Sequence, residues 1–329
     1  MPPVVGYVAA HEQFAPSDLI EYAVAAEKAG FDALWASDHF HPWQDNQGHA
    51  GHAWITLAAM GQRTERLLLA TGITCPTYRY NPAEVAHAFA SLGVLYPGRI
   101  FLGVGTGEAL NEVPAGGGWG PYRERAERLA EAITVIRRLW TEDWVDFEGR
   151  YYRLRGAKLY DKPPRPVPIY VAASGPSSAR LAGEHGDGWV TDAATLIGRK
   201  DVWRAFEEGA RAAGKDPNAM PRLVELYVFV GQRDEALEAA RLWQFHAVAG
   251  QVLDMSDPRQ IQDYAEENST PEREMGQWIV NADPRTHVDA INELVEAGAT
   301  HVVVHSAQRD QRRFIDFYGR DVLPALRRL

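Results

Sequence analysis

The sequence contains a single cysteine, no long apolar run and no excess of basic residues. Cys75 alone excludes an intramolecular disulfide and a cysteine-rich metal site, and it fits a reducing cytosol. The net charge of -10 argues against a nucleic-acid surface, which needs clustered basic residues. No apolar stretch approaches the roughly 20 residues of a membrane span, and Met1–Pro3 lacks the layout of a signal peptide. We therefore expect a cytoplasmic protein without nucleic-acid or membrane partners.

Short apolar runs, typical of buried parallel strands, alternate with amphipathic helical patterns along the 329 residues. The eight runs are Val4–Val8, Ala33–Ala36, Leu67–Ile73, Ile100–Val104, Ile169–Ala173, Trp189–Thr191, Val224–Val230 and His301–His305. The helical patterns include Ser17–Ala29, Ala53–Arg63, Pro82–Leu95 and Tyr122–Leu139. Eight strand–helix units in a chain of this length favour an α/β fold, a (β/α)8 TIM barrel spanning residues 1–329, over an open doubly wound sheet.

Two segments interrupt this alternation, at residues 144–168 and 250–271. The first, after the fourth predicted strand, has Glu148 and Gly149 between apolar flanks, which predicts a hairpin followed by a proline-rich linker. The second is polar and rich in acidic residues, and we expect it to be an insertion around the seventh and eighth units. Long insertions on a barrel often shape the substrate pocket.

Polar side chains collect where the predicted strands end, and these ends should share one rim of the barrel. The positions are Glu12, Asp38, His39, Thr74, Thr106–Glu108, Ser174–Gly175 and Asp192. A desolvated His39 can accept the proton of a hydroxyl group while a carboxylic acid elsewhere supplies or stores a proton, as hydride transfer requires. A lone histidine is more often structural, but its convergence with Glu12, Trp43 and Glu108 favours catalysis. Trp43 either packs at the rim or stacks on the reacting complex.

Two further patterns concern an anion and a metal. The segment Ala172–Ser178 joins a strand to a helix through small residues, so its backbone N–H groups could hold a phosphate; a tight turn chosen for packing is the alternative. His41, His49 and His52 do not have the spacing of a zinc site, and no cysteine accompanies them. We expect no metal.

Several motifs match a known family over nearly the whole chain. They are Glu12–Pro16, Ser37–Phe40, Arg79–Ala83, Leu95–Pro97, Phe101–Glu112, Val145–Gly149, Gly186–Gly188 and Asp310–Phe314. Together they closely resemble the deazaflavin-dependent glucose-6-phosphate dehydrogenases, which belong to the bacterial-luciferase-like barrels, and the string Gly103–Glu112 is highly specific. The resemblance implies a homodimeric barrel that binds coenzyme F420 and transfers hydride between a sugar or alcohol carbon and C5 of the deazaflavin.

The resemblance also implies roles for individual residues. By it, His39 takes the hydroxyl proton, Glu108 protonates the deazaflavin, Trp43 stabilises the reacting complex, and Glu12 contacts the substrate or supports its neighbours. The implied cofactor-binding residues are Asp38, Gly72, Ile73, Thr106, Gly107, Asn111, Ala173, Ser174, Gly175 and Ser177. The family has a cis peptide bond that does not precede proline, which would fall near Gly72–Ile73 here.

The sequence departs from the family where the substrate phosphate is held. The family uses two lysines and an arginine, and the corresponding substrate-binding positions here are Thr195, Asp263 and Gln277. A phosphate without these cations loses charge-assisted hydrogen bonds worth about 1.5–3 kcal/mol each, and Asp263 would repel it. We therefore expect a neutral substrate, either an unphosphorylated sugar such as glucose or another secondary alcohol.

Four alternatives remain open from the sequence. The chain could oxidise glucose 6-phosphate through a rearranged phosphate site that uses Arg199, Lys200, Arg259 or Arg273. It could be an FMN-dependent monooxygenase on the same barrel, or a glycosidase in which Glu12 and Glu108 act as paired carboxylates. It could also be a deazaflavin carrier without catalytic activity.

Overall fold

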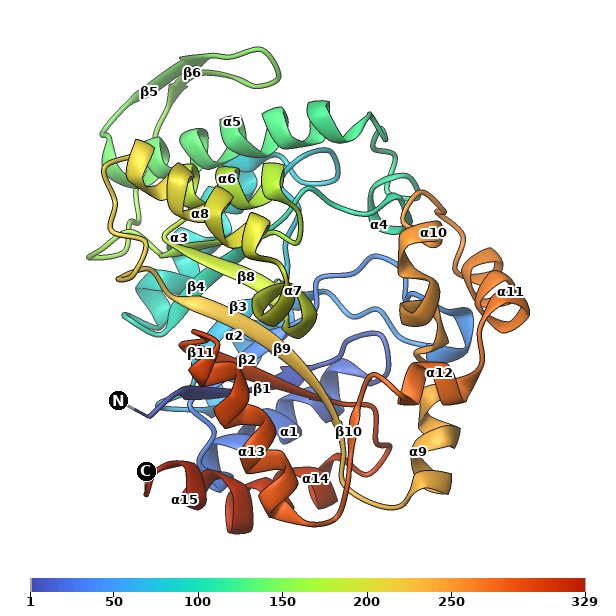
Figure 1. Ribbon diagram of the computed structural model, residues 1–329. Helices are drawn as coiled ribbons and strands as arrows, with labels where there is room; N and C mark the ends of the chain where they lie inside the picture. Colours follow the sequence, from blue (N-terminus) through green and yellow to red (C-terminus); the bar gives the residue numbers. More distant parts are fainter. Residues whose placement is uncertain (1, 329) are drawn as a thin grey trace.

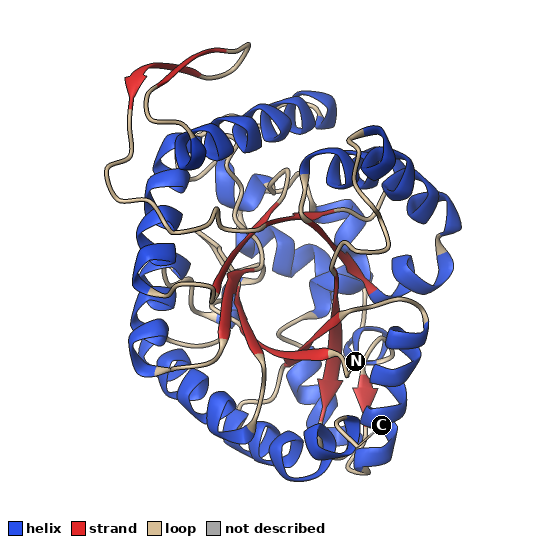
Figure 2. Cartoon of the chain, turned by 90° about the vertical axis from the view of Figure 1, so that its left-hand side faces the viewer, coloured by secondary structure: helices blue, strands red, loops and turns tan. Residues whose placement is uncertain are grey.

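Eight parallel strands close into a barrel with helices outside it in the computed structural model, which describes residues 2–328 (Figures 1 and 2). Around the ring the strands are β1 (Val4–Ala9), β2 (Ala33–Ala36), β3 (Leu68–Thr71), β4 (Ile100–Val104), β7 (Ile169–Ala172), β8 (Gly188–Asp192), β9 (Arg222–Phe229) and β11 (His301–Ser306). The ring closes where β11 pairs with β1, and β10 (Ile279–Val280) lies outside it along β9. All eight predicted strands, and the barrel, are confirmed.

The helices that pack around the barrel include every helix predicted from the sequence. Between the first strands lie α1 (Pro16–Ala29), η1 (Asp45–Gln47), α2 (Ala53–Arg63), α3 (Pro82–Leu95), α4 (Ala109–Glu112) and α5 (Tyr122–Thr141). Next come α6 (Pro176–His185), α7 (Ala193–Gly198), α8 (Lys200–Ala212), α9 (Arg233–Ala240), η2 (Gln244–Val248), α10 (Ala249–Val252) and α11 (Pro258–Asn268). The last are α12 (Pro271–Met275), α13 (Pro284–Glu296), α14 (Gln311–Phe317), η3 (Tyr318–Val322) and α15 (Leu323–Leu326). Within residues 2–328, none of these helices has the length and apolar character needed to cross a membrane.

The hydrophobic core has two parts, one on each side of the strands. The larger part fills the space between the strands and the outer helices. The smaller part lies inside the ring and contains one side chain from each barrel strand: Val8, Trp35, Ala70, Phe101, Tyr170, Val190, Leu223 and Val303. Since Val8, Trp35 and Val190 also line the pocket described below, this inner layer forms the pocket floor.

The two predicted interruptions have different structures. The first contains an antiparallel hairpin of β5 (Val145–Glu148) and β6 (Arg153–Ala157), as predicted, and it projects away from the barrel (Figure 2). The second is part of a longer excursion between β9 and β11, in which α9, η2, α10, α11 and α12 follow one another beside the barrel (Figure 1). Its acidic sequence forms capped helices: Asp257, for example, accepts a hydrogen bond from the backbone N–H of Arg259 at the start of α11.

Candidate active site

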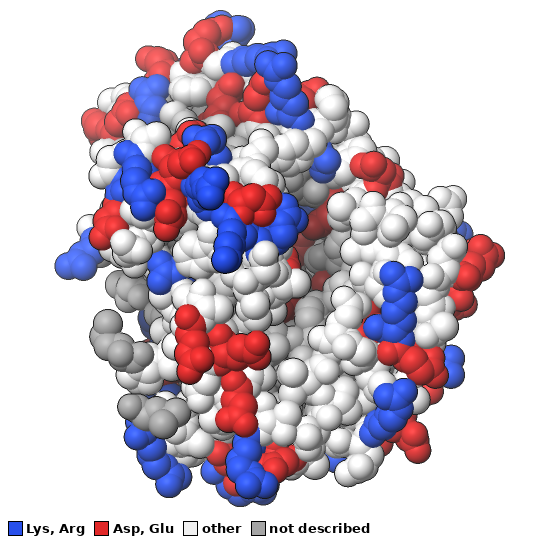
Figure 3. All heavy atoms as spheres, in the orientation of Figure 1, with Lys and Arg blue, Asp and Glu red and all other residues white. Residues whose placement is uncertain are grey.

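A pocket of about 480 Å³ opens at the carboxyl ends of the barrel strands. Figure 3 shows this face of the molecule hollowed between the side that carries α7 and α8 and the side that carries α10 to α12. The catalytic residues predicted from the sequence, Glu12, His39, Trp43 and Glu108, all line the pocket, and we call these four the reaction wall. The structure therefore brings the four predicted residues together in one pocket.

The centre of the reaction wall is a contact between His39 and Glu12. The Nε2 atom of His39 lies 3.3 Å from Oε1 of Glu12, and both side chains are almost completely buried. The other carboxyl oxygen of Glu12 accepts a hydrogen bond of 2.5 Å from the hydroxyl of Ser37. Burial alone would raise the pKa of Glu12, but the charge of His39 and the Ser37 hydrogen bond lower it below its usual value. Glu12 is thus a carboxylate placed to stabilise positive charge on His39.

The backbone near His39 determines which ring nitrogen can act as a base. Nδ1 of His39 lies 3.0 Å from the carbonyl oxygen of His41, which can only accept a hydrogen bond. This contact favours hydrogen on Nδ1, so Nε2 is the nitrogen that gains and loses a proton, and the Glu12 carboxylate beside it stabilises the protonated form. His39 is therefore oriented to take a proton at Nε2.

Asn111 connects the base to the acid. Its amide nitrogen donates to Oε2 of Glu108 at 2.9 Å and lies 3.3 Å from Nδ1 of His39. Its amide oxygen accepts from the backbone N–H of Phe40 at 2.8 Å. Asn111 is buried and does not line the pocket, whereas Glu108 does. Asn111 therefore bridges the side chains of His39 and Glu108.

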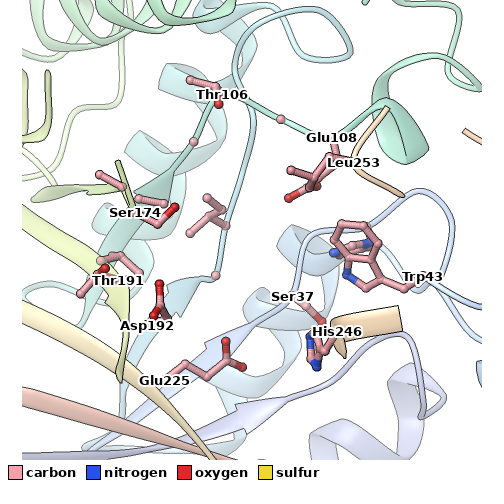
Figure 4. Close-up of a pocket in the computed structure, with 18 of the residues that line it drawn as sticks. Ser37, Trp43, Thr106, Glu108, Ser174, Thr191, Asp192, Glu225, His246 and Leu253 are labelled. Carbon is pink, nitrogen blue, oxygen red and sulfur yellow. The ribbon is translucent and has the colours of Figure 1, made fainter. Parts of the chain in front are cut away.

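Trp43 is held between the base and the insertion that follows β9. Its ring centroid lies 5.4 Å from that of His39, and it stacks on Phe245 of η2 at 4.6 Å with an interplanar angle of 11°. Figure 4 shows the Trp43 ring at the edge of the pocket. The indole therefore packs between His39 and Phe245 in the pocket lining.

The predicted cis peptide bond is present between Gly72 and Ile73, and both residues line the pocket. The Gly72 carbonyl accepts a hydrogen bond of 2.8 Å from the indole N–H of Trp35. A Cβ atom on Gly72 would lie 1.5 Å from that indole nitrogen, so only glycine fits beside the Trp35 ring.

The other predicted cofactor-binding residues fall into two groups. Thr106, Gly107, Ala173 and Ser174 line the pocket, together with Ser178, which the sequence analysis did not select. Gly107 has φ +84°, and a Cβ atom there would lie 2.5 Å from Sγ of Cys75. Gly175 and Ser177 do not line the pocket: the N–H of Gly175, at the start of α6, donates to Oγ of Ser178, and Ser177 is exposed.

Asp38 also differs from its predicted role as a cofactor contact. Its buried carboxylate accepts hydrogen bonds from Thr74 at 2.6 Å and Trp54 at 3.0 Å, and from Tyr80 and Arg79 at 3.1 and 3.2 Å. These partners lie behind the reaction wall, and Asp38 is absent from the pocket lining. Asp38 therefore anchors the segment that carries His39.

None of the three predicted substrate-binding residues lines the pocket. Thr195 is buried in α7, where Asp192 accepts hydrogen bonds of 2.7 Å from both its backbone N–H and its hydroxyl. Asp263 is exposed on α11, and Gln277 is exposed and donates to Glu274. Thr195 and Gln277 are thus hydrogen-bonded to neighbouring acidic residues, and substrate binding at the three positions stays a prediction.

The structure adds residues to the pocket that sequence reasoning missed: Arg125, Glu225, Tyr227, Trp243, His246 and His305. Glu225, Tyr227 and His305 lie within predicted strands, where alternating polar side chains could have indicated a wet inner face. Trp243 and His246 lie in the insertion, and no local motif marks them. Arg125 is the one Lys or Arg among the lining residues that the structure describes, against four carboxylates at Glu12, Glu108, Asp192 and Glu225.

Fold and site together are those of an α/β-barrel enzyme, with His39, Glu12 and Glu108 lining a pocket at the carboxyl ends of its strands. The chain belongs to the luciferase-like monooxygenase family, whose model matches residues 3–301. It is 49% identical to the F420-dependent hydroxymycolic acid dehydrogenase of Mycobacterium tuberculosis (strain ATCC 25618 / H37Rv), over 98% of this chain and 88% of that protein. It is 44% identical to the F420-dependent glucose-6-phosphate dehydrogenase of Mycolicibacterium gilvum (strain PYR-GCK), over 99% and 98% of the two chains.

The fold is also similar to that of a solved F420-dependent secondary alcohol dehydrogenase in complex with an F420–acetone adduct. The TM-score is 0.93 and the sequence identity 38%, over 99% of both chains. The resemblance drawn from the sequence motifs is thus confirmed.

Proposed function

We propose that this protein is an F420-dependent dehydrogenase that oxidises the CH–OH group of a neutral sugar or secondary alcohol. The relatives reported above support the cofactor and the reaction class. The observation that carries the proposal is the His39–Glu12 contact of 3.3 Å, with Glu108 and Trp43 lining the same pocket. It provides a base for the hydroxyl proton, a compensating charge and a separate acid.

The pocket fits a flat, anionic cofactor. Gly105 lies so close to Ile73 that a Cβ atom on it would be 2.3 Å from Cδ1 of the isoleucine, which leaves a side-chain-free surface for a ring. The Thr191 hydroxyl is buried in the lining without a hydrogen-bond partner among the described residues. Ser174 and Ser178 lie beside the start of α6, where a helix N-terminus favours a phosphate. Gly72, Ile73, Thr106, Gly107, Ala173 and Ser174 would hold F420, which when bound supplies C5 as the hydride acceptor.

The protein's own residues divide the proton chemistry between two places. His39 takes the hydroxyl proton at Nε2 as the carbon–hydrogen bond breaks, and the Glu12 carboxylate offsets the charge that His39 gains. Glu108, held by Asn111, carries a second proton at its carboxyl group without competing for Nε2. Trp43 covers His39 and keeps water from it.

The charge of the pocket supports a neutral substrate. The carboxylates of Glu12, Asp192 and Glu225 would repel a phosphate. The guanidinium of Arg125 lies 3.8 Å above the Trp119 ring, and its Nη1 donates to the carbonyl of Gly107. Arg125 thus sits at the Gly107 side of the pocket, where the cofactor would lie, and leaves no cation for a substrate phosphate.

The experiment follows the loss of deazaflavin absorbance with glucose and with glucose 6-phosphate at matched enzyme concentration. We expect kcat/KM to be higher for glucose. A higher value for glucose 6-phosphate would keep the dehydrogenase but refute the neutral substrate. Reduction of neither compound, with F420 binding shown by fluorescence titration, would exclude these sugars and direct the search to other alcohols.

The homodimer and the cytoplasmic location remain predictions. Light scattering of the purified protein measures the first, and fractionation of the source cells measures the second.

A further inference from the structure

A second set of polar side chains lines the pocket on the side formed by β9, β11 and η2. Glu225 and Tyr227 come from β9, His305 lies beside Tyr227 in the β11 register, and His246 comes from η2. Figure 4 shows Glu225 and His246 among the pocket side chains, on the side where Ser37 also lies. We call Glu225, Tyr227, His246 and His305 the acceptor wall.

The first half of the acceptor wall is a chain of three hydrogen-bonded groups. Nδ1 of His246 lies 3.2 Å from Oε1 of Glu274, and Nε2 of His246 lies 3.1 Å from the hydroxyl of Tyr227. Glu274 is buried and accepts further hydrogen bonds from Trp278 and Gln277, so it orients His246 with hydrogen on Nδ1. Nε2 then accepts the Tyr227 hydrogen, and the lone pairs of the Tyr227 oxygen remain available to a ligand.

Burial, together with the charges of Glu225 and Glu274, raises the pKa of Tyr227 well above its usual value, so the phenol keeps its hydrogen at neutral pH. The hydrogen bonds therefore run in one direction: Tyr227 donates to His246, and His246 donates to Glu274. The Tyr227 oxygen, which faces the pocket, is left as an acceptor.

The second half of the wall is the pair of Glu225 and His305. Nδ1 of His305 lies 2.8 Å from Oε1 of Glu225. His305 is 3% exposed, and its Nε2 is a buried atom with no hydrogen-bond partner among the described residues. A buried nitrogen without a partner in the lining of a pocket indicates that a ligand group completes it. With hydrogen on Nδ1, Nε2 is again an acceptor.

We propose that the acceptor wall binds a second hydroxyl group of the substrate, so that the enzyme takes a neutral polyhydroxylated compound, a polyol or sugar, in preference to a simple alcohol or a hydroxy lipid. This inference rests on the proposed function. The Tyr227 oxygen, His305 Nε2 and the free oxygen of Glu225 need hydrogen donors, which hydroxyl groups supply. A hydrocarbon chain would leave them desolvated and unpaired, and a phosphate would meet the Glu225 carboxylate.

The test compares glucose, isopropanol and a long-chain secondary alcohol as reductants of F420. For the unaltered protein we expect kcat/KM for glucose to exceed the other two values by more than tenfold. A higher kcat/KM for isopropanol or for the long-chain alcohol would overturn the inference while leaving the dehydrogenase in place.

Two conservative variants then locate the effect. Tyr227→Phe keeps the ring that stacks on His305 at 4.5 Å but removes the acceptor oxygen. Glu225→Gln keeps the shape and an oxygen for His305. We expect KM for glucose to rise about 10-fold in Tyr227→Phe and about 30-fold in Glu225→Gln, with a smaller change in kcat. The ratio of kcat/KM for glucose to kcat/KM for isopropanol should therefore fall in both variants.

Tyr160→Phe is the matched control, because Tyr160 is exposed and does not line the pocket; its kinetics should equal those of the unaltered protein. Equal losses for glucose and isopropanol in Tyr227→Phe would show that the wall is structural and overturn the inference. Calorimetry of glucose binding to the F420-loaded protein separates the two proposals. If Glu225→Gln weakens this binding, the acceptor wall binds the sugar, even where no hydride transfer occurs. Failure to bind F420 would refute the proposed function itself.

Discussion

The reaction wall and the acceptor wall share one pocket but are built differently. The reaction wall comes from the loops after β1, β2 and β4, and Asn111 and Asp38 hold it from behind. The acceptor wall comes from side chains on β9 and β11 and from η2, and only its His246 depends on the helical excursion after β9. In the proposed mechanism, the first wall does the same chemistry on any alcohol, whereas the second selects which alcohol binds.

This proposed division of roles would let relatives with similar barrels act on different substrates. A hydroxymycolic acid, glucose 6-phosphate and a secondary alcohol share one reacting CH–OH group and differ in everything attached to it. On the proposal made above, replacing side chains on the β9 side would change the attached groups that fit without moving His39 or Glu108. Specificity can therefore change while the proton chemistry stays fixed.

The largest expected effect comes from a substitution in the reaction wall. His39→Ala removes the base at Nε2, and we expect kcat to fall about 10³-fold, or about 4 kcal/mol, equally for glucose and isopropanol. Stopped-flow reduction of F420 measures this loss, and fluorescence titration should show unchanged affinity for the cofactor.

His49→Ala serves as the control for the His39 variant, because His49 is an exposed histidine nearby that does not line the pocket. Its kcat should match that of the unaltered protein. A His39 variant that keeps more than a tenth of the activity would remove this residue from the mechanism.

The next effect concerns what lies behind the reaction wall. Asp38→Asn leaves Arg79 buried with only Glu112, at 3.9 Å, as a charged partner. We expect the free energy of unfolding to fall by about 3 kcal/mol, since breaking a buried pair exposes the cost of the remaining charge. Urea titration at neutral pH measures the change, with the exposed Asp316→Asn as control. A loss no greater than the control's would mean that Asp38 does not anchor the wall.

A smaller effect follows from the link between acid and base. Asn111→Ala leaves the Phe40 N–H without its partner and frees Glu108, and we expect about 2 kcal/mol lower stability. Because Glu108 and His39 also lose their shared neighbour, kcat should fall more than KM rises, for every substrate alike. Selective damage to glucose oxidation would instead place Asn111 with the acceptor wall.

The two walls also differ in how far the sequence could predict them. Glu12, His39, Trp43 and Glu108 follow directly on strands that apolar runs mark, so local patterns placed them on one rim. The chain from Tyr227 to His246 to Glu274 spans separations of 19 and 28 residues, and its members meet only after the excursion folds against β9. Asp38 was assigned to the cofactor by the family resemblance, and an acid beside His39 looks the same in sequence whether it faces a ligand or Arg79.

The smallest expected effect concerns His301, which lies outside both walls at the start of β11. It tests how much this residue contributes to the loss of stability at acid pH. Burial lowers the pKa of His301 from 6.5 to about 4. Between these pH values the imidazole is protonated in the unfolded chain but not in the folded protein. The free energy of unfolding therefore falls as the pH falls from 6.5 toward 4.

His301→Gln removes this titration. We expect the free energy of unfolding to fall by about 1 kcal/mol less between pH 6.5 and pH 4 in the variant than in the unaltered protein. The effect is small because the ring is partly exposed and solvent screens its charge. Urea titrations at several pH values measure the slope. Glu12, whose pKa is lowered, should contribute only at lower pH, where its protonation removes the charge paired with His39. An unchanged slope in the variant would assign the acid sensitivity to groups other than His301, and His11, His185 and His287, whose pKa values burial also lowers, would be substituted next.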